Sequence, residues 1–186
     1  MPPFQAHPLR RSLRLEHYDY SRPGAYFITS CTLNRDPLLA KVESGAIQPT
    51  RAGTIVERVW HSLPTRFPSV QLDAFVIMPN HIHGVVWLRA VTADSERGPR
   101  LGDVVRAFKS IAAIEVNRAL ASVGRRLWQT DYYEHVVRCE ADLARIREYI
   151  LTNPLRWDFD RENGDARGTD PFDLWLESVG RQKPSP

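Results

Sequence analysis

The sequence predicts an α+β protein: a ferredoxin-like βαββαβ antiparallel sheet with helices on one face, followed by a C-terminal helix. Three observations predict this class. Runs rich in β-branched and aromatic residues alternate with amphipathic helical patterns. Two of these runs, residues 70–78 and 81–88, are joined by the turn pair Pro79-Asn80, and one more helical pattern follows the last run. With 186 residues, the chain is long enough for one domain with a proper core and too short for two.

The first half of the chain begins with a strand and a helix. Residues 25–33 (AYFITSCTL) follow the turn signal Pro23-Gly24 and are rich in β-forming residues, which predicts a central strand. Residues 51–63 carry apolar side chains three and four apart, which predicts an amphipathic helix that ends before Pro64. Residues 70–88 then form the predicted hairpin.

The second half adds a helix, a strand and a last helix. Residues 101–120 place apolar residues on one face and basic residues largely on another, which predicts a second amphipathic helix. Residues 132–138 (YYEHVVR) predict a short fourth strand. Residues 140–153 have acidic residues in the first turn and apolar residues at helical spacing, and Pro154 ends this last predicted helix.

Charge divides the chain into a basic body and an acidic tail. Residues 158–186 hold seven acidic and four basic residues, and the formal net charge is +3, so residues 1–157 carry about +6. We expect a single domain over residues 1–157, with residues 1–17 as an N-terminal arm and residues 158–186 as an acidic, partly disordered tail. Residues 97–128 contain seven Lys or Arg and two Asp or Glu, which suits a polyanion such as nucleic acid, although a solvated basic face has the same composition.

Composition argues against several classes of protein. No apolar run approaches the ~18 residues that a membrane span requires, and the N-terminal residues lack the apolar core of a secretion signal. Cys31 and Cys139 each stand alone, which provides neither a CxxC metal site nor a disulfide framework. These features favour a cytoplasmic protein that does not act at a membrane.

Two histidines, His81 and His83, interrupt the apolar run FVIMPNHIHGVVWL. In a strand they point to one face while Ile82 points to the other, with their Cα atoms ~7 Å apart. Both imidazoles can then reach one divalent ion, given a further ligand. Two hydrogen-bonded histidines on a half-exposed sheet face explain the pattern equally well. Val85 stands where a histidine-triad hydrolase needs a third histidine, and the motifs of a zinc deaminase are absent.

A tyrosine and an asparagine complete the candidate site. Tyr149 and Asn153 are four residues apart in the last predicted helix and therefore lie on one face of it. They offer a hydroxyl nucleophile and a neutral oxygen ligand. The alternative is that Tyr149 packs at the edge of the core and that Asn153 caps the helix before Pro154.

Together these features make the chain resemble the REP-associated tyrosine transposases, a branch of the single-tyrosine HUH transposases. The resemblance covers nearly all of residues 14–157. It rests on the segments Tyr18-Asp-Tyr, Pro23-Gly-Ala-Tyr-Phe-Ile-Thr, Met78-Pro-Asn-His-Ile-His-Gly, Phe108-Lys-Ser, Trp128-Gln, Tyr132-Tyr-Glu-His and Arg147-Glu-Tyr-Ile-Leu-Thr-Asn-Pro. The acidic segment after Trp157 matches no part of that pattern.

The resemblance implies an activity and roles for individual residues. It implies that Tyr149, on a C-terminal catalytic helix, is the nucleophile. It implies that His81, His83 and Asn153 form a metal site for Mg²⁺ or Mn²⁺. The implied substrate is single-stranded DNA beside palindromic hairpins, which is cut and rejoined through a 5′-phosphotyrosine intermediate, as in DNA transposition. The chain would work as a monomer or as a homodimer.

Candidate DNA contacts are basic and aromatic residues between the predicted hairpin and the last helix. Basic side chains neutralise phosphates, and aromatic rings stack on unpaired bases, although each residue can equally be a solvated or a core side chain. The candidates are Arg97, Arg100, Arg106, Lys109, Arg125, Arg126, Trp128, Tyr132 and Tyr133. Glu134 and His135 are expected either to support the metal or to be structural residues of their strand.

Three other functions remain open on the sequence. The chain could bind a DNA or RNA hairpin without cutting it and so act in regulation. It could be a metal-dependent phosphodiesterase that uses water, in which case Tyr149 would be dispensable. A purely structural ferredoxin-like module would leave the histidine pair and the basic region unexplained.

Overall fold

A four-stranded antiparallel sheet forms the centre of the computed structural model, which describes residues 18–91 and 98–180. Its strand order is β4-β5-β1-β6. The strands are β1 (Gly24–Cys31), β4 (Val70–Ile77), β5 (His81–Leu88) and β6 (Tyr133–Val136). Because β5 lies between β1 and β4, the connection through the first helix is a split βαβ unit, and the predicted ferredoxin-like class is confirmed.

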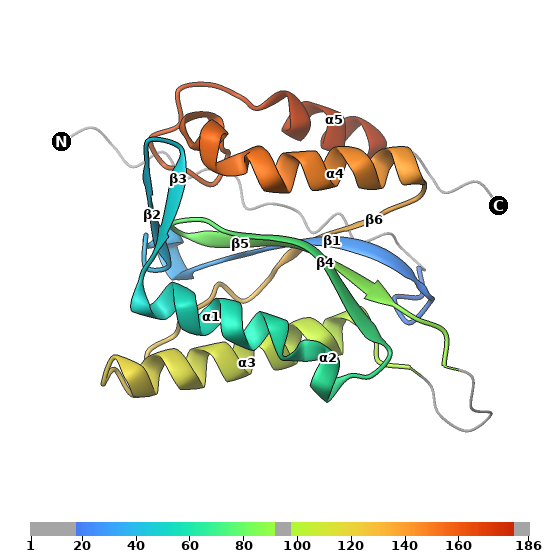
Figure 1. Cartoon of the computed structure of the whole chain (residues 1–186), viewed down its shortest axis with the longest axis horizontal. Helices are drawn as coiled ribbons and strands as arrows, with labels where there is room; N and C mark the ends of the chain where they lie inside the picture. Colours follow the sequence, from blue (N-terminus) through green and yellow to red (C-terminus); the bar gives the residue numbers. More distant parts are fainter. Residues whose placement is uncertain (1–17, 92–97, 181–186) are drawn as a thin grey trace.

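Helices cover both faces of this sheet. Figure 1 shows α1 and α3 on one face and α4 and α5 on the other. The helices are α1 (Arg51–His61), α2 (Leu63–Arg66), α3 (Leu101–Ala119), α4 (Glu140–Thr152) and α5 (Pro171–Gly180). Within the described ranges, none of them is long and apolar enough to cross a membrane.

Short elements lie between the predicted ones. They are the 3-10 turns η1 (Leu33–Arg35) and η2 (Asn153–Phe159) and the hairpin of β2 (Ala40–Glu43) and β3 (Ala46–Pro49). The hairpin turns at Ser44 and Gly45, which both have positive φ. Each of its strands has only four residues, and only Ala40 among them is fully buried, so the apolar pattern is too short to predict the hairpin.

Strand alternation divides the interior into two apolar clusters. Tyr26 and Ile28 of β1 and Ile82 of β5 lie in the cluster under α1 and α3. Phe27 of β1 and Val85 of β5 lie in the cluster under α4 and α5. Cys31 pairs with His81 and Thr29 with His83 in the β1–β5 ladder, so both histidines belong to the face under α4.

The chain after Trp157 continues this packed body. Residues 158 and 159 complete η2, and α5 follows after a turn-rich stretch. Phe172 and Leu176 of α5 are buried in the same cluster as Tyr149. The sequence predicted a tail beginning at residue 158, but in the structure residues 158–180 pack on the sheet and close the face that carries the histidines.

Gly84→Ala is expected to lower the free energy of unfolding by about 1–3 kcal/mol. A Cβ at position 84 would lie 2.5 Å from Cζ2 and 2.7 Å from Cη2 of the Trp60 indole, which is fully buried and stacked on Phe75. Urea unfolding measures the change, and Gly164→Ala is the control because its Cβ would meet no atom within 4 Å. Equal stability of the two variants would show that Trp60 can move aside.

Candidate active site

Strand β5 brings two imidazole nitrogens together in the interior. His81 and His83 are 0% and 2% exposed, and their Nε2 atoms lie 3.0 Å apart. His81 Nδ1 lies 2.8 Å from Oδ1 of Asn80, and His83 Nδ1 lies 2.8 Å from Oγ1 of Thr29. Because each outer nitrogen has a hydrogen-bond partner, each ring turns its Nε2 toward the same point, as in metal sites with oriented histidines.

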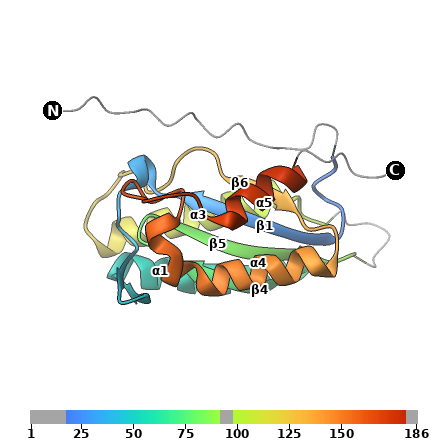
Figure 2. The ribbon, with the colours of Figure 1, turned by 90° about the horizontal axis from the view of Figure 1, so that it is seen from above.

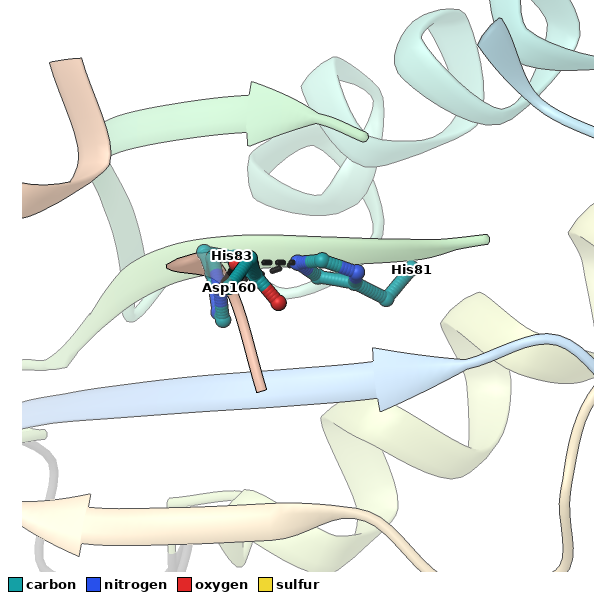
Figure 3. Close-up of side chains that lie close together, drawn as sticks. All are labelled: His81, His83 and Asp160. Carbon is teal, nitrogen blue, oxygen red and sulfur yellow. Dashed lines mark hydrogen bonds and ion pairs between the residues drawn. The ribbon is translucent and has the colours of Figure 1, made fainter. Parts of the chain in front are cut away.

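Asp160 adds a carboxylate to this point. Its Oδ2 lies 3.7 Å from Nε2 of His81 and 3.9 Å from Nε2 of His83, and Figure 3 shows it beside both rings. Burial pushes the pKa of Asp160 upward, but the two histidines and the Asn153 amide outweigh burial and hold that pKa well below its usual range. Asp160 is not among the residues that the sequence predicts for the site, because it lies in the segment predicted to be a tail.

Helix α4 and the turn after it supply the tyrosine and the asparagine. The Tyr149 hydroxyl oxygen lies 3.2 Å from Nε2 of His83 and 3.5 Å from Oδ2 of Asp160. Asn153 donates from Nδ2 to Oδ2 of Asp160 at 2.9 Å. The structure therefore gathers the four predicted residues His81, His83, Tyr149 and Asn153 around one carboxylate within a single chain.

The donor set fits a divalent metal ion. The nearest ligand atoms of His81, His83 and Asp160 all lie within 4.8 Å of one another, and all three residues are buried. Oδ1 of Asn153 is buried and has no hydrogen-bond partner among the described residues, so it is available as a further oxygen ligand. Two imidazoles with carboxylate and amide oxygens suit a first-row transition metal such as Mn²⁺ better than Mg²⁺, which prefers oxygen ligands alone.

The ring of Tyr149 is enclosed by the segment that follows α4. It stacks on Phe172 of α5 with ring centroids 3.7 Å apart and planes 8° apart. The Arg156 guanidinium carbon lies 5.4 Å from the ring centroid, and Arg156 also forms an ion pair with Asp170 at 3.2 Å. Tyr149 is only 2% exposed as a result.

The predicted basic DNA contacts divide into exposed and engaged side chains. Arg106 is exposed and pairs with Asp103 on the first turns of α3. Lys109, in contrast, donates to the main-chain carbonyls of residues 129–131 at 2.7, 2.9 and 3.2 Å, and burial lowers its pKa. Lys109 therefore holds a loop, which differs from the phosphate contact that the sequence predicted.

Three of the remaining basic candidates, Arg100, Arg125 and Arg126, lie at the surface. Arg125 pairs with Asp36 at 3.5 Å, and Arg126 donates to Oγ1 of Thr130 at 2.9 Å. Arg100 is exposed at the start of α3, where its N–H bonds Oδ2 of Asp103. Arg97 lies outside the described residues.

The aromatic candidates are placed mostly in the interior. Trp128 is 5% exposed and packs near Phe108, and Tyr133 is 5% exposed and packs near Phe27. Their rings cannot accept a base without opening the core, so their prediction as stacking residues is not supported by the structure. Tyr132 is partly buried against the cluster under α1 and α3.

Glu134 and His135 do not join the metal cluster. Glu134 pairs with Ile28 and so faces the helices α1 and α3, away from His83. His135 faces α5, where its ring lies 6.2 Å from that of Trp175. Among described His, Cys, Asp and Glu side chains, the cluster that could hold a metal contains His81, His83 and Asp160.

Comparison with known proteins finds related sequences and a related fold. A Haemophilus influenzae protein, named only as uncharacterized, is 36% identical over 169 residues, which span 82% of this chain and 92% of the relative. The REP-associated tyrosine transposase of Escherichia coli is 24% identical over 119 residues, which span 59% of this chain and 64% of that protein. A solved REP-associated tyrosine transposase bound to a REP hairpin matches with a TM-score of 0.55 at 20% identity, over 77% of this chain and 73% of that one. No protein-family model matches the chain.

His135→Phe is expected to flatten the dependence of stability on pH between pH 6.5 and 4. Burial lowers the pKa of His135 from 6.5 to about 4, so in this window the unfolded chain binds more protons than the folded one. The contribution of His135 is therefore fully present above pH 6.5 and is lost as pH falls toward 4, by up to about 3 kcal/mol. Urea unfolding of both proteins across this window measures it, and parallel curves would contradict the assignment.

Proposed function

The chain belongs to the transposase-like family that includes the REP-associated tyrosine transposases, and we propose that it cleaves and rejoins single-stranded DNA beside a palindromic hairpin. One observation carries the proposal: the Tyr149 hydroxyl lies 3.2 Å from His83 Nε2 at the edge of a buried two-histidine, one-carboxylate cluster. A hydroxyl nucleophile beside a metal site is one arrangement that supports phosphoryl transfer through a covalent intermediate.

His81, His83 and Asp160 would hold the metal, with Oδ1 of Asn153 as a further ligand. A bound Mn²⁺ or Mg²⁺ would act as a Lewis acid on the scissile phosphate and offset charge in the transition state. Asn80 and Thr29 orient the two rings through their outer nitrogens. Asp160 orients the Asn153 amide by accepting from its Nδ2.

Tyr149 would be the nucleophile. Its phenolic oxygen attacks phosphorus, a Tyr149–O–P bond forms, the bond to the 3′ oxygen breaks, and the 3′ oxygen takes a proton from water and leaves as a hydroxyl. The phenolic proton passes to water once the segment that covers Tyr149 has opened, and the charge of a bound metal would favour its release. The 5′-phosphotyrosine conserves one phosphodiester bond, so a second 3′ hydroxyl can reverse the step and join a new strand.

DNA would have to displace part of the C-terminal segment to reach Tyr149. The phenol is 2% exposed and its ring is covered by Phe172, so no phosphate can approach it in this arrangement. The same observation favours a second candidate function, binding of a nucleic-acid hairpin without cleavage. A covalent adduct distinguishes the two.

Tyr149→Phe is expected to abolish adduct formation, because it removes the attacking oxygen and keeps the ring. The assay incubates the protein with labelled single-stranded DNA that carries a hairpin and with Mn²⁺, and resolves adducts on a denaturing gel. Tyr26→Phe is the control, since Tyr26 is buried on the opposite face of the sheet. An adduct from Tyr149→Phe would refute the nucleophile, cleavage without an adduct would favour a hydrolase, and binding without cleavage would favour the regulatory function.

Asp160→Asn is expected to weaken Mn²⁺ binding at least ~10-fold, because it removes the charged member of the donor set without changing its shape. Titration calorimetry measures the affinity without DNA. Asp158→Asn is the matched control, because Asp158 is exposed and lies 3.9 Å from Arg167 away from the cluster. Equal Mn²⁺ affinity of the two variants would show that Asp160 is not a ligand.

A further inference from the structure

A forked ion pair joins α4 to the sheet two residues before Tyr149. Arg147 donates from Nε to Oδ1 of Asp73 at 2.9 Å and from Nη2 to Oδ2 at 2.7 Å. The same carboxylate accepts from Nε1 of Trp87 at 3.0 Å and from the main-chain N–H of Ala74 at 2.7 Å. Both oxygens of Asp73 thus carry two donors each, and Arg147 first and then Trp87 hold the pKa of Asp73 at about 2.

A bulge in β4 aims Asp73 at α4. The β4–β5 ladder pairs Leu72 with Val86 and then Phe75 with Gly84, so Asp73 and Ala74 together oppose the single residue Val85. Leu72 and Phe75 pack on the side of α1 and α3, while Ala74 packs on the side of α4. The extra residue therefore places two consecutive side chains on the α4 side, which a regular strand cannot do.

The apolar contacts of α4 do not by themselves set its position along the sheet. Leu143, Ile146 and Ile150 bury it, but apolar packing has no direction. A slide by one residue moves the helix ~1.5 Å along its axis and turns it by ~100°. The two hydrogen bonds between Arg147 and Asp73 tolerate neither change. Figure 2 shows α4 running along β4, the strand that carries Asp73.

We propose that Asp73 and Arg147 are positioning residues for strand transfer: their fork fixes the axial register of α4 on β4 and thereby holds the Tyr149 hydroxyl beside His83. The inference rests on the proposed function. Tyr149 follows Arg147 by two residues, or ~3 Å along the axis, so the register set by the fork passes directly to the phenol. The histidines lie on β5, and their outer nitrogens are held by Thr29 and Asn80, which belong to β1 and to the β4–β5 turn rather than to α4.

The test measures the rate of adduct formation on hairpin DNA with Mn²⁺ for Asp73→Asn, Arg147→Gln and the double variant. We expect the maximal rate at saturating DNA to fall ~10²-fold in each single variant. The DNA concentration for half-maximal rate should change less than ~3-fold, since neither residue binds DNA in this proposal. The double variant should be no slower than either single one, because the two residues act as one unit.

Arg58→Gln is the matched control. Arg58 forms an ion pair with Glu115 at 2.5 Å that joins α1 to α3 on the other face of the sheet, so its loss should leave the rate within ~2-fold. Arg147→Lys, which keeps one charged donor, should be intermediate in rate, and it replaces Arg147→Gln if that variant does not fold.

The outcomes separate this inference from the function on which it rests. If the unaltered chain forms the adduct and the Asp73 and Arg147 variants form it as fast as Arg58→Gln, the positioning role is refuted and the function stands. If both single variants are slow but their losses multiply in the double variant, the two residues do not act as a unit and the inference also fails. If the unaltered chain forms no adduct, the proposed function itself fails.

Discussion

The rest of this structure depends on one constraint: three buried polar side chains, those of His81, His83 and Asp160, lie in close contact with one another. Two imidazoles and a carboxylate lose their hydration when they are buried, and only mutual contacts and outer hydrogen bonds offset that cost. Each group accordingly has a partner from a different element: Thr29 from β1, Asn80 from the β4–β5 turn and Asn153 from the end of α4. Satisfying this cluster ties the sheet, the last helices and the segment between them together.

The two faces of the sheet divide stability and chemistry between them. The face under α1 and α3 packs large apolar side chains such as Trp60 and Phe108, with Gly84 leaving room for the indole. The face under α4 carries the histidines and their polar partners beside a second apolar cluster, which includes Phe27 and Val85. Because strand alternation sends consecutive residues of β5 to opposite faces, one strand serves both purposes, and substitutions on the first face can change stability without touching the polar cluster.

Local patterns predicted the elements well and long-range contacts poorly. Strand β5 and helix α4 were predicted within a residue because their patterns are strong and their ends are marked by turn residues. The same local rules placed His81 and His83 on one face of a strand and Tyr149 and Asn153 on one face of a helix. The family resemblance then assigned both pairs to a single site. The roles of these four residues stay predictions, although the structure brings them together.

What the sequence could not predict depends on contacts between distant segments. Asp160 lies 77 residues after His83 in a stretch whose composition is that of a tail, and no periodicity connects the two. Lys109 was predicted to contact phosphate because it is a basic residue on a helix. The sequence does not show that its ammonium bonds three carbonyls of a loop twenty residues away. A usable signal was present for α5, whose apolar residues Phe172 and Leu176 are four apart and mark a helix with a face to bury.

Several of the acidic residues after Trp157 are buried and form ion pairs with arginines, which the net charge of the segment does not show. Four of its carboxylates are buried. Asp160 faces the histidines, and each of the other three has a cation: Glu162 bonds Arg35 at 2.8 Å, Asp170 bonds Arg156 at 3.2 Å and Asp173 bonds Arg161 at 3.2 Å. Glu162 also accepts, through its main-chain oxygen, from the Asn80 amide at 2.7 Å. Since Asn80 orients His81, the docking of this segment is connected to the geometry of the histidine pair. Removal of one partner from any of these pairs leaves the other charge buried and unpaired, so each pair stabilises the docked segment.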